Sequence, residues 1–401
     1  MSVETYAVRR VQDAEVDGRS VLVRVDFNVP LRDGEIGDDS RIRAALPTLE
    51  LLLERGAKVL IATHLGRPAG SVVPELRLDR VAHRLSELIG KAVVKLDDCV
   101  GSEVEARVEQ GDPGELFLLE NVRFHPEEAA NETSFARKLA ALADIFVNDA
   151  FAAVHRAHAS TLGVAELLPS YAGCLMQREL DALSRLLVDP DRPYLAVVGG
   201  KKAASKLGAL RDLVGQVDAL LIGGGVAFSV LAARGTAVGE SLVDEGTFDE
   251  IRAFLAAAEA SEVDVVLPTD ARVAQSLEPG EETAVSDVAS IPFGWAGFDI
   301  GPETADLFRR RILEARSVVW TGPMGAFEVE PFDEGTKAVA EALAASDAFS
   351  VVGGGETGEA VARFGFEGDV SYVSTGGGAC LALLRGKKLA ALEALRETTE
   401  S

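Results

Sequence analysis

The chain of 401 residues is longer than one hydrophobic core usually serves, so we expect two domains. Apolar residues make up 47% and charged residues 26%, which is typical of a folded globular protein and argues against disorder. The formal net charge of −24 argues against nucleic acid as a partner, and no stretch reaches the roughly 18 apolar residues of a membrane span. With no signal peptide at its start, the chain is expected to be cytoplasmic and to bind no membrane.

The excess of acidic residues suggests a high-salt environment. Carboxylates keep a protein soluble, but their mutual repulsion destabilises the compact state unless salt screens it. We therefore expect a halophilic source, with an acidic mesophilic enzyme as the alternative. Cys99, Cys174 and Cys380 show neither a disulfide pattern nor the paired spacing of a zinc site, so we expect small buried side chains.

Short β-branched runs alternate with longer segments of helical period along the whole chain, which predicts an α/β fold with parallel sheets. In the first half, the strands are expected at 21–29, 58–65, 116–123 and 145–151. In the second half, they are expected at 193–198, 218–222, 263–267, 317–321, 349–352 and 369–373.

A helical pattern at 173–190 separates the halves and ends at Asp-Pro and Arg-Pro breakers. We expect two doubly wound, Rossmann-like domains at 1–172 and 191–385, joined by this segment as a hinge helix.

Basic residues and histidines follow the predicted strands of the first half, where open α/β sheets bind ligands. They are Arg24, Arg41, His64, Arg67, Arg123, His155, Arg156 and His158. Clustered guanidinium groups need a counter-charge, and a phosphate or carboxylate accepts their paired hydrogen bonds. The cluster therefore predicts a small polyanionic ligand, and Asp26 and Asn28 add acceptors for a hydroxyl group. For any single arginine, an ion pair with a surface carboxylate is the alternative. For the histidines, a hydrogen-bonded structural role is expected rather than metal binding.

Five motifs in this half resemble the substrate domain of phosphoglycerate kinase in order and spacing: RVDFNVP, the SRI segment, HLGRP, LLENVRF, and VNDAF followed by HRAH. The resemblance implies a site for 3-phosphoglycerate or 1,3-bisphosphoglycerate. It also implies that Arg41 stabilises the transferring phosphoryl group. The implied substrate residues are Asp26, Phe27, Asn28, Arg41, His64, Leu65, Gly66, Arg67, Arg123 and Arg156.

Five glycine-rich segments follow predicted strands of the second half: VVGGKKAASK, LIGGGVAF, WTGPMGAFE, VVGGGETGEA and VSTGGGACL. Glycine lets backbone N–H groups approach a phosphate chain closely. No P-loop motif is present. The segment 353–358 fits G-x-G-x-x-G, so a dinucleotide site in a dehydrogenase is an alternative, but it leaves the other four clusters unexplained. Tight packing turns could account for any one cluster.

These segments resemble the nucleotide domain of the same family, so the resemblance spans nearly the whole chain. It implies ATP or ADP as a ligand, with Mg²⁺ as the cofactor. The implied nucleotide residues are Lys202, Lys206, Gly224, Pro323, Glu328, Gly353, Gly354, Gly355, Glu356 and Thr357. Ser205 and Glu356 stand where many members of the family carry aspartate. Glu356 is the expected metal ligand, with a purely helix-terminal role as the alternative.

The resemblance implies that the 3-phosphoglycerate carboxylate attacks the γ-phosphoryl group of MgATP, with Arg41, Lys202 and the N–H groups around Gly354 and Gly355 stabilising the charge. It also implies hinge closure and a carboxy-terminal segment, 386–401, that returns to the first domain. We expect a monomer of the archaeal, halophilic type. The competing interpretations are an NAD-dependent dehydrogenase and a non-catalytic binder of sugar phosphates.

Overall fold

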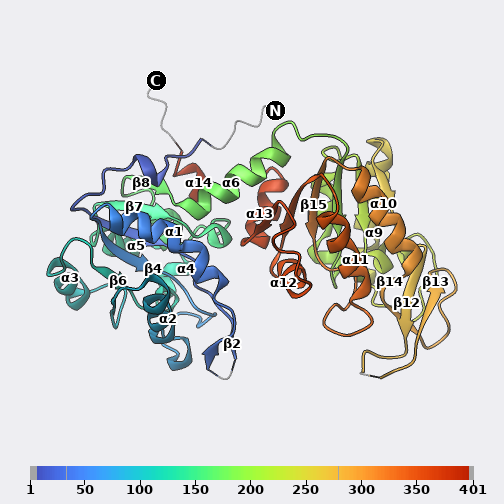
Figure 1. Cartoon of the computed structure of the whole chain (residues 1–401), viewed down its shortest axis with the longest axis horizontal. Coiled ribbons are helices and arrows are strands. Elements are labelled where there is room, and N and C mark those ends of the chain that lie inside the picture. Colours follow the sequence, from blue (N-terminus) through green and yellow to red (C-terminus); the bar gives the residue numbers. More distant parts are fainter. Residues whose placement is uncertain (1–6, 33, 279, 397–401) are drawn as a thin grey trace. The chain divides into compact units, whose positions relative to one another are not determined.

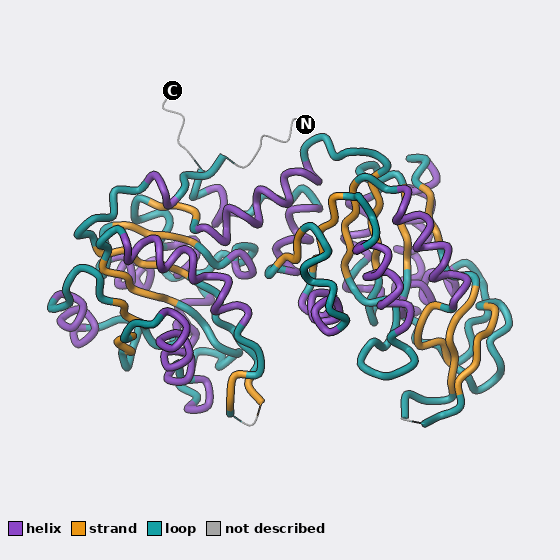
Figure 2. The backbone as a smooth tube through the Cα atoms, viewed as in Figure 1, coloured by secondary structure: helices purple, strands orange, loops and turns teal. Residues whose placement is uncertain are grey.

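The computed structural model describes residues 7–32, 34–278 and 280–396, which form two compact units. Unit 1 comprises the described residues up to Asp181 together with those from Lys388 on, and unit 2 comprises Ala182–Lys387. Each unit is built on a parallel β-sheet with helices on both faces (Figure 1, Figure 2), which confirms the predicted α/β class. Among the described residues, no helix has the length and apolar character needed to cross a membrane.

The sheet of unit 1 has six parallel strands in the order β5-β6-β4-β1-β7-β8. Their bounds are Ser20–Arg24 (β1), Lys58–Ala62 (β4), Val93–Lys95 (β5), Leu116–Leu118 (β6), Ile145–Asn148 (β7) and Ser170–Ala172 (β8). Strand β1 lies centrally, and its register aligns Arg24 with Ala62 of β4 and Asn148 of β7. The loops that follow β1, β4 and β7 therefore leave the sheet side by side.

Alternating side chains of the strands supply two cores, one on each face of this sheet. Val21 and Val23 pack with the apolar faces of α1 and α2, whereas Leu22 packs on the opposite face with α3 and α5. The helices are α1 (Ser40–Glu54), α2 (Asp79–Ile89), α3 (Ser102–Glu109), α4 (Pro126–Ala129) and α5 (Thr133–Ala140). A small antiparallel pair, β2 (Leu31–Arg32) and β3 (Glu35–Ile36), precedes α1.

The sheet of unit 2 also has six parallel strands, in the order β11-β10-β9-β15-β16-β17. Their bounds are Tyr194–Val198 (β9), Ala219–Ile222 (β10), Asp264–Val266 (β11), Ser317–Thr321 (β15), Phe349–Gly353 (β16) and Tyr372–Ser374 (β17). The strand order reverses between β9 and β15. Open α/β sheets bind ligands beyond the carboxyl ends of strands at such a point.

Helices α10 (Pro302–Glu314), α11 (Glu334–Ala344) and α12 (Gly355–Arg363) share one apolar core with this sheet. On the other side, α9 (Phe248–Ala260) packs on β11 and α13 (Gly377–Leu384) on β16, and α7 (Leu207–Leu213) contacts both helices. Helix α8 (Gly224–Ala233) packs beside α9 and against β14. Strand β14 belongs to a separate antiparallel sheet of β12 (Asp270–Ala274), β13 (Thr283–Asp287) and β14 (Ala296–Ile300).

Helix α6 (Cys174–Leu187) contains the point at which the chain divides into the two units. Its first turn is fastened within unit 1, because Cys174 N donates to Thr48 Oγ1 at 2.8 Å and Met176 N donates to Asp149 Oδ1 at 3.0 Å. Burial raises the pKa of Asp149 to about 6. After unit 2, the chain forms α14 (Ala390–Glu393) and pairs with the first described residues through Arg9 N and Leu395 O, at 2.9 Å.

The predicted strands all overlap observed strands, and 317–321 coincides with β15, but those of the first half extend too far. For example, 21–29 ends as a strand at Arg24 and 116–123 ends at Leu118. The extra residues are the loops beyond the sheet edge, whose apolar side chains, such as Val25 and Phe27, are buried like those of a strand. Strands β5, β8 and the antiparallel sheet were not predicted. The prediction of three buried cysteines is wrong for Cys174, which is half-buried at the start of α6.

Candidate functional site

The site in unit 1 is built around a buried histidine at the carboxyl end of β4. His64 lies beside Arg24 at the end of β1, with 3.1 Å between His64 Nδ1 and Arg24 Nη2. A guanidinium group can only donate, so Nδ1 is the acceptor and the neutral ring carries its proton on Nε2. His64 therefore presents an N–H donor.

Four arginines surround this ring. The pKa of His64 is well below its ordinary value, chiefly because the side chain is buried and then because of nearby positive charge. The contributing guanidinium groups are those of Arg24, Arg123, Arg156 and Arg41. Arg24 is the last residue of β1, Arg41 lies in the first turn of α1, and Arg123 and Arg156 lie in the segments after β6 and β7. The structure thus brings together three of the four arginines predicted to bind the substrate.

Two carboxylates partly balance this charge. Asp26 pairs with Arg41 and lies 3.8 Å from His64 Nδ1. Glu128, fully buried, accepts hydrogen bonds from the backbone N–H and the hydroxyl of Ser160, at 2.8 and 2.6 Å. Ser160 Oγ in turn accepts from Arg24 Nε at 2.8 Å. Arg24 is therefore a buried structural cation held beneath the site.

Arg123 is incompletely neutralised. Its Nη1 donates to the Gly66 carbonyl at 2.8 Å, yet burial and the charges of Arg156 and Arg24 lower its pKa to about 10. Asp26 and Glu128 oppose that shift without cancelling it. Four guanidinium groups facing two carboxylates leave an excess of positive charge, which is the electrostatic condition for binding a polyanion.

The loop after β4 is shaped by side chains from neighbouring loops. Asn28 Oδ1 accepts from Gly66 N at 2.8 Å, and Phe27 N donates to Thr63 Oγ1 at 2.9 Å. Asn121 Nδ2 donates to the Leu65 carbonyl at 2.8 Å. Asn28, predicted to bind a substrate hydroxyl, therefore also fixes the loop.

Arg67 differs from the other predicted substrate residues. Its side chain is exposed and makes no hydrogen bond or ion pair within the part of the chain that the structure describes. His155 is exposed and His158 is half-buried. His155 accepts from Arg156 Nε at 3.4 Å, and His158 lies 3.6 Å from Glu128.

The site in unit 2 is a set of interlocked glycine loops beyond β9, β10 and β15. Gly200 N donates to the Pro323 carbonyl at 2.8 Å, and Gly224 N donates to the Met324 carbonyl at 2.9 Å. Gly322 has φ of +88°, and a Cβ on it would lie 2.2 Å from the carbonyl oxygen of Gly199. These glycines therefore allow backbones to pack directly at the point where the strand order reverses.

Two predicted lysines take different positions in this site. Lys206 is half-buried and donates to Thr321 Oγ1 at 3.0 Å. Burial lowers its pKa, while the negative charge of Glu356 opposes the shift, so Glu356 lies close enough to influence Lys206. Lys202 is exposed. Ser205 donates its hydroxyl to the Lys202 carbonyl at 2.7 Å and stabilises the turn between them.

Helix α12 begins beside these loops. Gly354, with φ of +118°, precedes it, and Gly355 and Glu356 are its exposed first residues. The next residue, Thr357, is buried and its hydroxyl accepts from Gly322 N at 2.7 Å. The amino end of α12 is thus fixed against the loop after β15, with its first N–H groups available to an anion.

The remaining predicted nucleotide residues lie in or near these glycine loops. Pro323 is buried in the loop after β15, Gly353 is the buried last residue of β16, and Glu328 is exposed. Gly377 has a different role, because a Cβ on it would lie 2.6 Å from the Cα of Gly354. The glycines of the last segment, VSTGGGACL, therefore include a packing residue that supports the α12 loop.

Some residues of the sites were missed in the sequence. No sequence motif marks Glu128 or Ser160, because each is a single polar residue in an ordinary helical or loop segment. Cys99 proves to have neighbours that can bind metal, since ligand atoms of Asp98, Cys99 and His125 lie within 4.8 Å of one another. His125 and Asp98 already satisfy each other in an ion pair of 2.7 Å, so this cluster is explained without a metal.

Comparison with known proteins gives the family. The family model described as phosphoglycerate kinase matches residues 11–387. The chain belongs to the phosphoglycerate kinase family. Phosphoglycerate kinase from Moorella thermoacetica is 50% identical over 387 residues, covering 96% of this chain and 98% of the relative. That from Rubrobacter xylanophilus is 50% identical over 392 residues, covering 98% and 99%.

Solved phosphoglycerate kinases share the fold. The structure from Coxiella burnetii has a TM-score of 0.87 at 39% identity and covers 97% of this chain and 98% of its own. The structure from Pyrococcus horikoshii has a TM-score of 0.83 at 34% identity and covers 96% and 98%.

The family assignment makes the chain a phosphotransferase with a carboxyl group as acceptor. The reaction is reversible phosphoryl transfer between 1,3-bisphosphoglycerate with ADP and 3-phosphoglycerate with ATP. The dehydrogenase and the non-catalytic binder are thereby set aside. The expected archaeal type is not supported, because the similar curated relatives are bacterial.

A substitution of Thr357 tests the contact between the first turn of α12 and the loop after β15. In Thr357→Val, the buried Gly322 N–H loses its acceptor at nearly constant side-chain volume, a loss of about 1–3 kcal/mol. We expect a lower melting temperature and a KM for ATP raised several-fold, measured by calorimetry and steady-state kinetics. Thr283→Val is the control, since the Thr283 hydroxyl makes no hydrogen bond within the described chain. Equal KM values in both variants would contradict a role in shaping the nucleotide site.

Proposed function

We propose that the arginine cluster of unit 1 binds 3-phosphoglycerate. The arrangement of Arg24, Arg41, Arg123 and Arg156 around the neutral His64 ring is the observation that carries the proposal. Arg123 and Arg156, with Arg67 from the exposed loop, hold the phosphate. His64 Nε2–H donates to the substrate, and Asp26 and Asn28 accept from its hydroxyl group. Phe27, Leu65 and Gly66 supply the backbone of the surrounding loops.

The glycine loops of unit 2 bind the nucleotide in this proposal. N–H groups at the amino ends of α8 and α12, which begin at Gly224 and Gly355, face the phosphates. Lys206 lies half-buried beside them, and Lys202 reaches the transferring group. Pro323 contacts the nucleoside and Glu328 the ribose.

The reaction follows from these positions. A carboxylate oxygen of 3-phosphoglycerate forms a bond to the γ-phosphorus of ATP, and the bond from that phosphorus to the bridging oxygen breaks, so the electron pair leaves with ADP. No covalent intermediate with the enzyme is needed. Arg41 and Lys202 stabilise the negative charge on the transferring group, with the N–H groups of Gly354 and Gly355. The reverse direction makes ATP in glycolysis.

Transfer requires the two bound substrates to meet in the absence of water. If each unit binds one of them, a movement about the chain flanking α6 brings them together, and exclusion of water protects the acyl phosphate from hydrolysis. The proposal therefore includes hinge bending of a monomer in the cytoplasm.

Mg²⁺ fits the nucleotide site through Glu356. The Glu356 carboxylate is exposed, is free of hydrogen bonds and ion pairs within the described residues, and stands at the amino end of α12. One carboxylate together with phosphate oxygens is a usual ligand set for this ion. When bound, Mg²⁺ neutralises phosphate charge. Ser205 adds no charge to the set.

A substitution of Arg41 tests its proposed role in stabilising the transferring phosphoryl group. Arg41→Ala should lower kcat by about a thousandfold, because a positioned arginine of this kind is worth 10³–10⁵ in phosphoryl transfer. The Kd for ATP should stay within about twofold, as measured by calorimetric titration, because Arg41 belongs to unit 1. Arg19→Ala, immediately before the amino end of β1, is the control. A near-normal kcat in Arg41→Ala would remove Arg41 from this role.

A substitution of Glu356 tests whether its carboxylate binds Mg²⁺. Glu356→Gln should raise the Mg²⁺ concentration for half-maximal rate about tenfold, because the amide lacks the charge of the carboxylate. Glu359→Gln, one turn further along α12 and also exposed, should leave that concentration unchanged. An unchanged requirement in Glu356→Gln would leave Glu356 with only its helix-terminal role.

From the net charge of −24, we propose that the protein is adapted to high salt. Screening should reduce the repulsion among carboxylates, so the melting temperature should be higher in molar KCl than in dilute buffer. Calorimetric scans in the two solutions measure the difference. Equal melting temperatures would exclude a halophilic dependence.

A further inference from the structure

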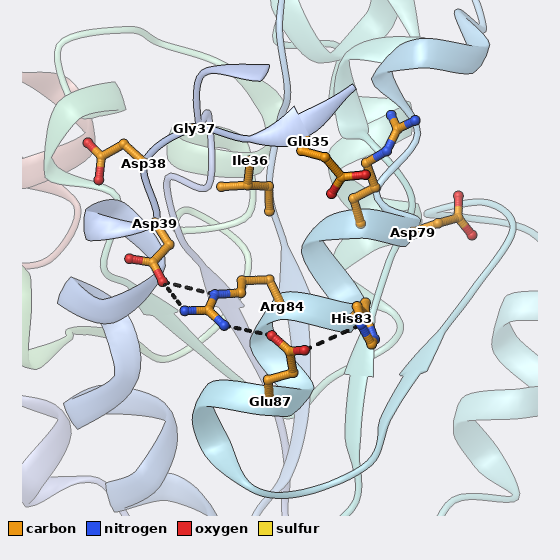
Figure 3. Close-up of a pocket in the computed structure, with 10 residues that line it drawn as sticks. Glu35, Ile36, Gly37, Asp38, Asp39, Asp79, His83, Arg84 and Glu87 are labelled. Atoms are coloured by element: carbon orange, nitrogen blue, oxygen red, sulfur yellow. Dashed lines mark hydrogen bonds and ion pairs between the residues drawn. The ribbon is translucent and has the colours of Figure 1, made fainter. Parts of the chain in front are cut away.

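The first turn of α1, which carries Arg41, is tied to α2 by a side-chain interaction outside the substrate cluster. The tie lies in an open pocket of about 780 Å³ between the segment before α1 and one face of α2 (Figure 3). Arg84 of α2 donates from Nε and Nη2 to Asp39 Oδ2, at 2.9 and 2.7 Å. Its Nη1 donates to Glu87 Oε2 at 2.6 Å, so all three guanidinium nitrogens are engaged.

Asp39 stands at the position where a side chain usually caps the helix. Aspartate at this position ordinarily accepts from a backbone N–H of the first turn. The Asp39 carboxylate makes no such bond. Its oxygens accept from Arg84 and from Arg43 Nε, the latter at 2.8 Å, and these bonds lower the pKa of Asp39. The carboxylate is therefore ionised at neutral pH and committed to holding α1 against α2.

The backbone of Asp39 transmits this position to the helix. Its carbonyl accepts from Ile42 N at 2.9 Å and from Arg43 N at 3.0 Å, so these bonds close the turn that contains Arg41. The Arg41 guanidinium meets Asp26 at the end of β1. The position of Arg41 is thus fixed at two points: its tip by Asp26 and its backbone by the contact of Asp39 with Arg84.

We infer that Arg84 is a positioning residue for phosphoryl transfer, acting through Asp39 on the location of Arg41. The inference rests on the proposed role of Arg41. Catalysis is sensitive to displacement, and a misplacement of about 1 Å can cost 10²-fold in rate. Loss of the tie shifts the first turn of α1 without removing any group that touches substrate.

The experiment compares Arg84→Gln with Arg80→Gln. Arg80 lies one turn earlier on α2 and lines the same pocket, but it makes no hydrogen bond or ion pair within the described chain. Arg80→Gln therefore removes the same charge as Arg84→Gln without breaking a contact. We expect kcat to fall roughly tenfold in Arg84→Gln, with KM for 3-phosphoglycerate and ATP within about twofold, and Arg80→Gln to behave like the unaltered enzyme. Arg84→Lys, which keeps the charge without the planar fork, should recover part of kcat.

A double-mutant cycle separates positioning from general structural weakening. If Arg84 acts through Arg41, Arg84→Gln should change kcat little once Arg41→Ala is present. If Arg84 has a general structural effect, the fold-losses of kcat in the two single variants should multiply in the double variant. Unchanged kcat in Arg84→Gln, an equal loss in Arg80→Gln, or a full loss in the Arg41→Ala background would each overturn the inference. A near-normal Arg41→Ala enzyme would instead refute the proposed role of Arg41.

Melting temperatures verify that each variant is folded at the assay temperature. Should Arg84→Gln not fold, Asp39→Asn provides the same test from the other side of the contact, because the amide keeps the shape but loses the charge that Arg84 requires. The same tenfold loss of kcat at unchanged KM is expected, and normal kcat in Asp39→Asn would overturn the inference.

Discussion

Unit 1 depends on a local excess of positive charge that the chain itself does not neutralise. Around His64, four guanidinium groups face only two carboxylates, and Arg123 has its pKa lowered to about 10 despite the nearby negative charges. An anion that accepts paired hydrogen bonds removes this imbalance. Because the whole chain carries a charge of −24, the cluster is a strong local exception, and it defines the ligand better than any single residue does.

Unit 2, which we propose to bind the nucleotide, offers donors for an anion of a different kind. Its loops present backbone N–H groups and contain few fixed charges, and their close packing is possible because several positions lack a Cβ. Thr357 and Lys206 fasten α12 and the loop after β9 to the end of β15. Backbone donors held this way need no rearrangement when charge develops on a phosphate, which is the condition for electrostatic stabilisation of a transition state.

The fold class and most strand positions could be predicted from the sequence, because buried parallel strands leave continuous apolar runs. The carboxyl ends of the first-half strands could not, since Val25 and Phe27 are buried in loops as fully as Val23 is in the sheet. The types of residue in the site were also predictable from their places after strands. Their burial was not predictable: Arg24, the last residue of β1, is fully buried and structural, whereas Arg67, in the loop after β4, is exposed. The partners that decide this, Glu128 and Ser160, are distant in sequence from Arg24.

The location of Arg41 combines two sources of positive potential. It is the second residue of α1, and the amino end of a helix already carries a partial positive charge. A guanidinium group there is repelled by its own helix unless acidic side chains compensate. Asp38 accepts from Ser40, Asp39 accepts from Arg43 and Arg84, and Asp26 accepts from Arg41 itself. These carboxylates make the arrangement stable in the free enzyme. Since Asp39 is engaged with Arg84 of α2, and Asp38 with Ser40 of α1 itself, the positive potential of the helix end and of Arg41 is left to act on the side of Asp26, where the arginine cluster lies.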